Sequence, residues 1–177
     1  MVAVLLLVAI NPFTASAQYE KGTKDLNIGV GLIRTFGFSG ETSSVPPLSA
    51  SFEVGTSDNL SFGGYVGYAS QSYNRSSYYG SDVSVSYFLF GPRMGYHFAL
   101  IPKADTYVGA MIGYGAATVS VTSSSGLGTS STPVAAVSSF VYSVHGGIRY
   151  PFSPKIGGFA EIGYGISVLN LGLNAKF

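Results

Sequence analysis

The sequence contains no cysteine and few charged residues. The missing cysteines exclude a disulfide framework, thiolate catalysis and cysteine-ligated metals, although they do not decide the cellular compartment. Only 10% of the 177 residues are charged, whereas 46% are hydrophobic. A soluble domain carries roughly 25% charged residues, because its whole surface faces water. The composition therefore indicates that much of this protein's surface does not face water.

Long apolar runs are also scarce. Outside residues 2–10, no run approaches the roughly 20 apolar residues that a membrane-spanning helix needs. Only helices and closed barrels satisfy every backbone hydrogen-bonding group in lipid. The chain is long enough for one domain, so its apolar character favours a transmembrane β-barrel. The net charge of +1 gives no reason to expect nucleic acid or an acidic partner.

The N-terminal segment has the pattern of a secretory signal. Residues 2–10 (VAVLLLVAI) are apolar, and residues 15–17 (ASA) match the small-x-small rule for cleavage. We therefore expect residues 1–17 to be a signal peptide and residues 18–177 to form the mature domain. No Lys or Arg precedes the apolar region, which departs from the usual pattern.

A short phrase recurs four times, at residues 28–31 (IGVG), 66–69 (VGYA), 112–115 (IGYG) and 162–165 (IGYG). In each copy a large apolar residue alternates with glycine or alanine. Alternate side chains of a strand point to opposite faces, so each copy has one apolar face and one nearly bare face. The interior of an eight-stranded barrel is only just wide enough for side chains. We therefore place the bare face inside and the apolar face toward lipid.

Alternation at period two predicts eight strands, at residues 25–33, 48–55, 60–69, 83–98, 106–117, 138–152, 157–166 and 168–177. The predicted fold is an all-β, eight-stranded antiparallel up-and-down transmembrane barrel. Short turns alternate with long polar loops at 34–47, 70–82 and 118–137, the last of low complexity. Transmembrane barrels place short turns in the periplasm and long loops outside. Both termini are therefore expected in the periplasm.

Residues 91–98 (GPRMGYHF), 107–110 (YVGA) and 112–115 (IGYG) resemble the outer-membrane β-barrel domain family, which includes the opacity proteins and barrels like outer membrane protein A. The ending 169–177 (LNLGLNAKF) resembles the signal read by the barrel-assembly machinery, with Phe177 last. The resemblance covers residues 24–177 and makes 18–177 an outer-membrane β-barrel domain. It implies contacts with outer-membrane lipid, periplasmic chaperones and the assembly machinery. It leaves activity open, because the family includes adhesins, structural barrels, small-solute channels and lipid-modifying enzymes.

Few residues have the chemistry of an active site. Ser143, His145 and Glu161 are candidates for a serine-type triad, but their inward parity keeps them away from lipid substrates. His97 is expected at the membrane interface or in the lumen.

The sequence has two histidines and no His-x-x-x-His spacing, which argues against a metal site. The glycine phrases lack the third glycine and the helix of a nucleotide loop. We predict no catalytic residue, no metal and no cofactor.

Five charged residues have inward parity on five different strands, namely Glu53, Arg93, Arg149, Glu161 and Lys176. Charges inside a narrow barrel are costly unless they are paired. We therefore predict a structural network of ion pairs that closes the lumen, and the similarity to outer membrane protein A-like barrels implies the same. A slip of one residue at a bulge, near 83–85 or 119–121, would keep these residues apart.

Taken together, these features favour a monomeric barrel with a structural or surface-interaction role and no enzymatic activity. Its loops would contact an extracellular ligand, and no nucleic acid is expected. A small-solute channel is the main alternative, disfavoured because side chains fill an eight-stranded lumen. A lipid-modifying outer-membrane enzyme is the remaining alternative.

Overall fold

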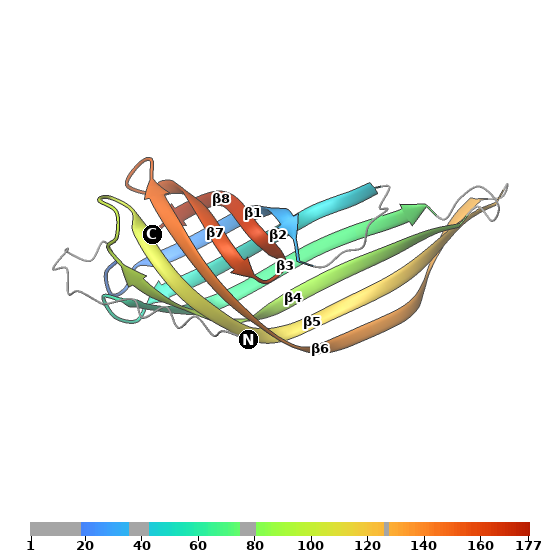
Figure 1. Cartoon of the computed structure of the whole chain (residues 1–177), viewed down its shortest axis with the longest axis horizontal. Coiled ribbons are helices and arrows are strands. Elements are labelled where there is room, and N and C mark those ends of the chain that lie inside the picture. The colour runs from blue at the N-terminus through green and yellow to red at the C-terminus, as the bar shows by residue number, and fades with distance from the viewer. Residues whose placement is uncertain (1–18, 36–42, 75–80, 126–127) are drawn as a thin grey trace, which may run out of the picture.

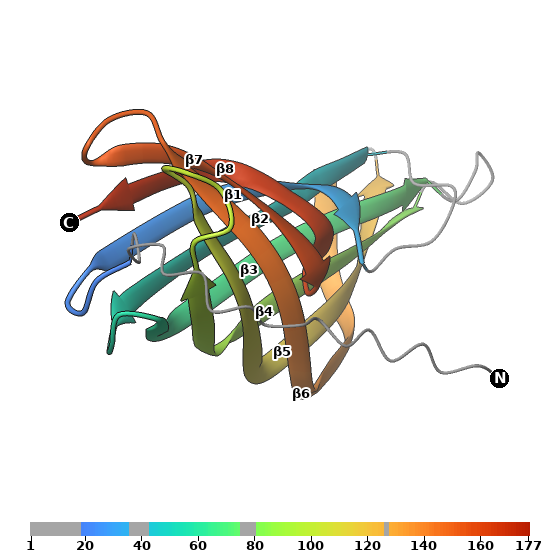
Figure 2. The ribbon, with the colours of Figure 1, turned by 60° about the vertical axis from the view of Figure 1, so that its left-hand side comes forward.

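The computed structural model describes residues 19–35, 43–74, 81–125 and 128–177, so the predicted signal peptide lies outside the described residues. In these residues eight antiparallel strands close into one barrel, and β1 pairs with β8 (Figures 1 and 2). The strands are β1 (Lys24–Arg34), β2 (Ser43–Gly55), β3 (Leu60–Asn74), β4 (Ser81–Phe98), β5 (Asp105–Ser125), β6 (Gly128–Pro151), β7 (Ile156–Tyr164) and β8 (Ser167–Lys176). The predicted fold class is confirmed.

No described segment forms a helix that is long and apolar enough to cross a membrane.

Side chains alternate as the repeated phrase predicts. Ile112 and Ile162 are 64% and 63% exposed on the outside of the barrel. Inward-facing glycines leave room for large side chains in the lumen. For example, a Cβ added at Gly147 would clash with the Tyr107 ring. An apolar exterior around a polar interior is the inverse of a soluble barrel and is the arrangement found in lipid. The inside–outside assignment made from the sequence is confirmed.

The long loops are shorter than predicted. The low-complexity stretch 118–137 is not a loop, because β5 and β6 continue through most of it and Val119 pairs with Ala135. Alternating Val and Thr residues favour strands, and the two arms of this hairpin supply each other's hydrogen-bonding partners. β2 likewise begins at Ser43, inside the predicted loop 34–47. The Ser- and Gly-rich composition of residues 118–137 predicts a loop, whereas pairing between the two arms of the hairpin makes most of this stretch β-strand.

Two register shifts fall beside prolines. The ladder between β2 and β3 shifts between Val45 and Leu48, which flank two prolines. The ladder between β5 and β6 shifts where Ser120 pairs with Pro133. Proline cannot donate a hydrogen bond to the ladder, so it is confined to edges and bulges. Neither shift separates the inward charges, because both lie far from them along the strands.

The barrel wall is uneven in height. β6 pairs with β7 only from Val144 to Pro151. Among the described residues, the rest of β6 pairs with β5 alone. The sheet of β3 to β6 therefore continues well beyond the β7–β8 hairpin, as Figure 1 shows. We refer to residues 70–74, 81–86, 116–125 and 128–143 as the sheet extension. The opposite end, with the short turns 56–59, 99–104 and 152–155, is the turn end.

Candidate functional site

Four of the five inward charges selected from the sequence contact one another in the lumen. Arg93 Nε lies 2.8 Å from Glu53 Oε1, and Arg93 Nη2 lies 2.6 Å from Glu161 Oε2. Arg149 Nη2 lies 3.1 Å from the same oxygen of Glu53. Glu53 therefore joins the two guanidinium groups, and the four residues come from β2, β4, β6 and β7.

Two carboxylates that the sequence analysis did not select extend this network. Asp105 Oδ2 accepts a hydrogen bond from Arg149 Nη1 at 3.1 Å, and Asp25 Oδ2 lies 3.8 Å from the same nitrogen. Asp25 shares the inward parity of Gly29, so the strand pattern contained the signal for it. Asp105 lies one residue before the strand predicted from 106. Lys176, the fifth predicted member, places its ammonium 6.0 Å from the centroid of the Tyr19 ring.

The network is buried and well supplied with partners. Glu53 is fully buried and Arg93 is 3% exposed. Ser61 donates to Glu53 at 2.8 Å, and the Tyr107 hydroxyl donates to Glu161 at 3.0 Å. The guanidinium of Arg149 lies 4.4 Å from the centroid of the Tyr107 ring, which is within cation–π range. Buried charges with this many partners tie different strands together across the lumen.

Tyr19 covers the network at the turn end. It precedes β1 and is 2% exposed, and its ring stacks on His97 with centroids 3.6 Å and planes 8° apart. The Gly22 N–H donates to the Gly55 carbonyl at 2.9 Å and fixes the segment. Gly22 has a φ of 89°, which glycine adopts without strain. Burial raises the pKa of the Tyr19 phenol, so the ring stays neutral. Sequence reasoning missed this residue because it precedes the first alternating segment.

His97 lies in the lumen in a triad-like row. Its Nδ1 is 2.8 Å from Asp105 Oδ1 and its Nε2 is 2.9 Å from Ser61 Oγ, the spacing of a Ser-His-Asp triad. Ser61, however, has one hydroxyl proton and donates it to Glu53. The single hydroxyl proton of Ser61 is therefore directed at Glu53 and not at His97 Nε2. Ser61 and His97 are also buried, and Tyr19 stacks on His97, so this row is a structural hydrogen-bond chain.

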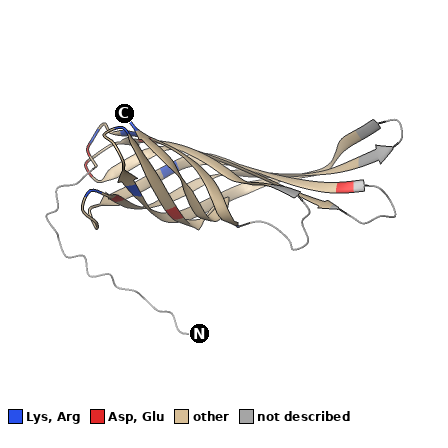
Figure 3. Ribbon diagram, turned by 90° about the horizontal axis from the view of Figure 1, so that it is seen from above, with Lys and Arg blue, Asp and Glu red and all other residues tan. Residues whose placement is uncertain are grey.

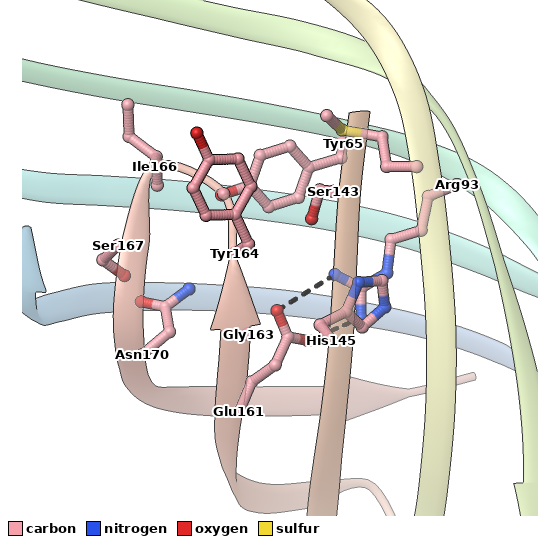
Figure 4. Close-up of a pocket in the computed structure, with 12 residues that line it drawn as sticks. Tyr65, Arg93, Ser143, His145, Glu161, Gly163, Tyr164, Ile166, Ser167 and Asn170 are labelled. Atoms are coloured by element: carbon pink, nitrogen blue, oxygen red, sulfur yellow. Dashed lines mark hydrogen bonds and ion pairs between the residues drawn. The ribbon is translucent and has the colours of Figure 1, made fainter. Parts of the chain in front are cut away.

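The three residues considered for a serine-type triad do not form one either. His145 Nε2 has no hydrogen-bond partner among the described residues. The carboxylate of Glu161 is directed at Arg93 instead, as Figure 4 shows. Ser143 and His145 line a small cavity of about 10 Å³, room for about one water molecule. Among the described residues, no group of three or more His, Asp or Glu is placed to hold a metal.

Apolar side chains fill the lumen toward the sheet extension. The cluster consists of Tyr65, Ala69, Leu89, Met111 and Ile166, with Tyr87 and Val141 packed against it. Ile166 belongs to the tight turn between β7 and β8 and is 2% exposed, so its side chain enters the lumen from the rim of the short wall. The described lumen is thus filled in three layers: Tyr19 and His97, the charge network, and this apolar cluster.

Removing the Tyr19 ring should loosen the turn end. We expect Tyr19→Ala to lower the free energy of unfolding by about 3 kcal/mol, since truncating a buried aromatic leaves a cavity. Tyr19→Phe is the matched control, because the buried hydroxyl has no hydrogen-bond partner and its loss should be neutral. Urea unfolding of both variants in detergent micelles measures the difference. Equal stability of Tyr19→Ala and wild type would show that the Tyr19 ring lies at the turn end without stabilising the barrel.

A closed barrel with an apolar exterior and a charge-paired lumen defines a transmembrane β-barrel. The sequence model described as outer membrane protein beta-barrel domain matches residues 2–176. The chain belongs to this family and is an integral outer-membrane protein of the Gram-negative envelope. The family resemblance seen in the sequence is confirmed.

Solved structures share the fold. Ail, the attachment invasion locus protein of Yersinia pestis, solved with the heparin analogue sucrose octasulfate, is 13% identical with a TM-score of 0.54, covering 89% of this chain and 99% of its own. A de novo designed transmembrane β-barrel is 16% identical with a TM-score of 0.50, covering 89% of this chain and 98% of its own. At these identities the likeness shows the fold alone. No curated protein matches the sequence.

Proposed function

We propose that this protein is a non-enzymatic surface-interaction barrel, with a closed lumen and a sheet extension that contacts a partner outside the cell. The observation that carries the proposal is the edge of β6. From Gly128 to Ser143, this strand pairs with β5 on one side and with no described residue on the other. An unpaired strand edge offers a row of N–H and C=O groups that can pair with a strand of another protein.

The side chains of this edge support the same role. Val134, Val137, Phe140 and Tyr142 are between 59% and 85% exposed. Residues 106–148 contain no Lys, Arg, Asp or Glu. Proteins usually protect an exposed edge with charges, and here only the bulge at Pro133 interrupts it. An exposed, uncharged edge is a surface suited to pairing with an extended polypeptide.

The topology belongs to this proposal. We place the turn end in the periplasm, with cleavage after Ala17, both termini periplasmic and the protein monomeric. The Phe177 N–H donates to the Lys24 carbonyl at 2.9 Å, which supports placing both termini on the same side of the membrane. Short turns at this end and long hairpins at the other match the usual orientation of outer-membrane barrels.

The filled lumen favours an interaction role over the two alternatives. A small-solute channel needs a continuous aqueous path, whereas the three layers of side chains occupy the described lumen. A lipid-modifying enzyme needs an activated nucleophile that its substrate can reach. Ser61 is hydrogen-bonded to Glu53 and buried, and Ser143 lacks the aligned base.

The edge can be blocked with one charge. We expect cells that display Val137→Lys to lose most of their binding to host or matrix surfaces, because a lysine on the edge opposes strand pairing. Val83→Lys is the matched control, since β4 lies between β3 and β5 in the sheet extension and has no free edge. Binding of labelled whole cells is the measurement.

Two results would contradict this proposal. Equal binding by both lysine variants and the wild type would remove the β6 edge from the interaction. The chain also has no cysteine, so Ser139→Cys can be labelled without background. Failure of a membrane-impermeant maleimide to label it on intact cells would overturn the orientation.

A further inference from the structure

The five lysines of the chain all lie at the turn end. Lys21 and Lys24 stand at the start of β1, Lys103 and Lys155 lie in two of the short turns, and Lys176 ends β8. All except Lys176, which is partly buried, are exposed. In Figure 3 the basic segments crowd toward this end of the barrel. We refer to these five residues as the lysine rim.

The charge of the molecule is sorted along the barrel axis. The lysine rim is accompanied by two carboxylates, Glu20 and Asp58, which leaves three net positive charges at the turn end. The lumen holds four carboxylates and two guanidinium groups, a net charge of two negative when the histidines are neutral. The remaining four charged residues, Arg34, Glu41, Arg75 and Asp82, cancel. The three regions add up to the net charge of +1, so all of the excess positive charge lies at the rim.

Exposed aromatic residues set the depth of this rim in the membrane. Phe52, Tyr96, Tyr150, Phe152 and Phe177 are between 45% and 71% exposed at the same end. Aromatic girdles of outer-membrane barrels lie at the membrane–water interface. With these rings at the interface, we expect the exposed lysines of the adjoining turns at the level of the lipid phosphates, because lysine stems reach along apolar surface and place the ammonium in the polar layer.

The opposite end is built to cross lipid. Residues 106–148, which form most of the β5–β6 hairpin, have no Lys, Arg, Asp or Glu. Charged groups enter the bilayer interior at high cost, and Asp82 is the one charged residue of the sheet extension. A barrel that approaches a membrane would therefore pass its sheet extension through and keep the lysine rim on the side of entry.

We propose that the lysine rim binds the phosphates of anionic phospholipids in the periplasmic leaflet and holds the turn end there while the sheet extension crosses the bilayer. The inference rests on the proposed orientation. Basic residues next to a bilayer are attracted to anionic headgroups within about a Debye length, roughly 8–10 Å at moderate salt. The four exposed lysines, Lys21, Lys24, Lys103 and Lys155, lie at the start of β1 and in two separate turns. They therefore reach lipids on more than one side of the barrel, unlike a pocket for one ligand.

The test is folding of the full chain from urea into phosphatidylcholine vesicles with and without phosphatidylglycerol. Unboiled gels follow the folded band over time. We expect phosphatidylglycerol to raise the folding rate about tenfold at low salt, and high salt to remove the effect. The gain should be lost when Lys21, Lys24, Lys103 and Lys155 are all changed to Gln. The matched variant with four Lys→Arg changes keeps the charge and should keep the gain.

The outcomes separate the lipid contact from its rivals. A wild-type rate that does not respond to phosphatidylglycerol would overturn the proposal, and this result needs no variant. Retention of the gain by the four-Gln variant would overturn it too. Salt-sensitive binding to purified peptidoglycan, lost in the four-Gln variant and without any phosphatidylglycerol effect, would assign the rim to cell-wall carboxylates. The orientation is tested separately by labelling Ser139→Cys on cells, so failure of the topology and failure of the lipid contact are distinguishable.

Discussion

Replacing Arg93 with methionine should lower the free energy of unfolding by about 3–5 kcal/mol. The change removes the cationic partner of Glu161 and one of the two cationic partners of Glu53, and a buried charge without its partner is strongly destabilising. Glu161→Gln should cost a similar amount for the same reason. The double variant should lose less than the sum of the two, by roughly 0.5–3 kcal/mol, because contacting residues couple. Urea titration in detergent, read by the folded band on unboiled gels, gives the three values.

Lys155→Ala is the control for this cycle. The side chain is exposed in a turn, so its removal should change stability by less than about 0.5 kcal/mol. A shorter side chain at position 93 tests whether the network closes the lumen. Wild-type protein in planar bilayers should conduct weakly, and Arg93→Ala should raise the conductance. A large, steady wild-type conductance would favour the small-solute channel, and strictly additive losses would mean that the contact between Arg93 and Glu161 contributes nothing.

Phe177→Ala should abolish assembly in cells and leave refolding in detergent almost unchanged. The ring is 71% exposed, so its packing contributes little to stability. The backbone bonds between Phe177 and Lys24, which close the seam of β1 and β8, persist in the variant. The structure thus separates the two roles of this residue. Loss of the folded band in outer membranes, together with normal refolding of the purified chain, would assign the ring to recognition by the assembly machinery.

Two further variants serve as controls for the role of the Phe177 ring in assembly. Phe177→Tyr preserves an aromatic ring and should assemble normally. Phe152→Ala removes another exposed ring at the turn end, 69% exposed, and should also assemble, because it lies outside the C-terminal segment. Equal defects in Phe152→Ala and Phe177→Ala would mean that both rings only anchor the barrel at the interface. A normal yield of Phe177→Ala in the outer membrane would reduce the ending to an ordinary strand.

Local periodicity made most of the fold predictable. Period-two alternation is a property of neighbouring residues, so Ile162, Gly163 and Tyr164 by themselves identify a strand with one apolar and one bare face. The same parity placed Glu53, Arg93, Arg149 and Glu161 inside before any contact was known. Strand ends were less predictable. The stretch 118–137 was misassigned because its Ser and Gly content is typical of loops, while its strand state depends on pairing across the hairpin.

Only the tertiary structure decided which inward charges meet. Arg149 and Glu53 are 96 residues apart, and Arg93 and Glu161 are 68 apart. Their contact depends on barrel closure and on the stagger between strands, which no single strand encodes. Closure also brought Tyr19 onto His97, and the unequal heights of β6 and β7 left one edge of β6 unpaired. The sequence by itself determined what each strand shows to lipid and to the lumen, because side-chain direction is local; the assembled barrel determined what each side chain touches, because those contacts join strands distant in the chain.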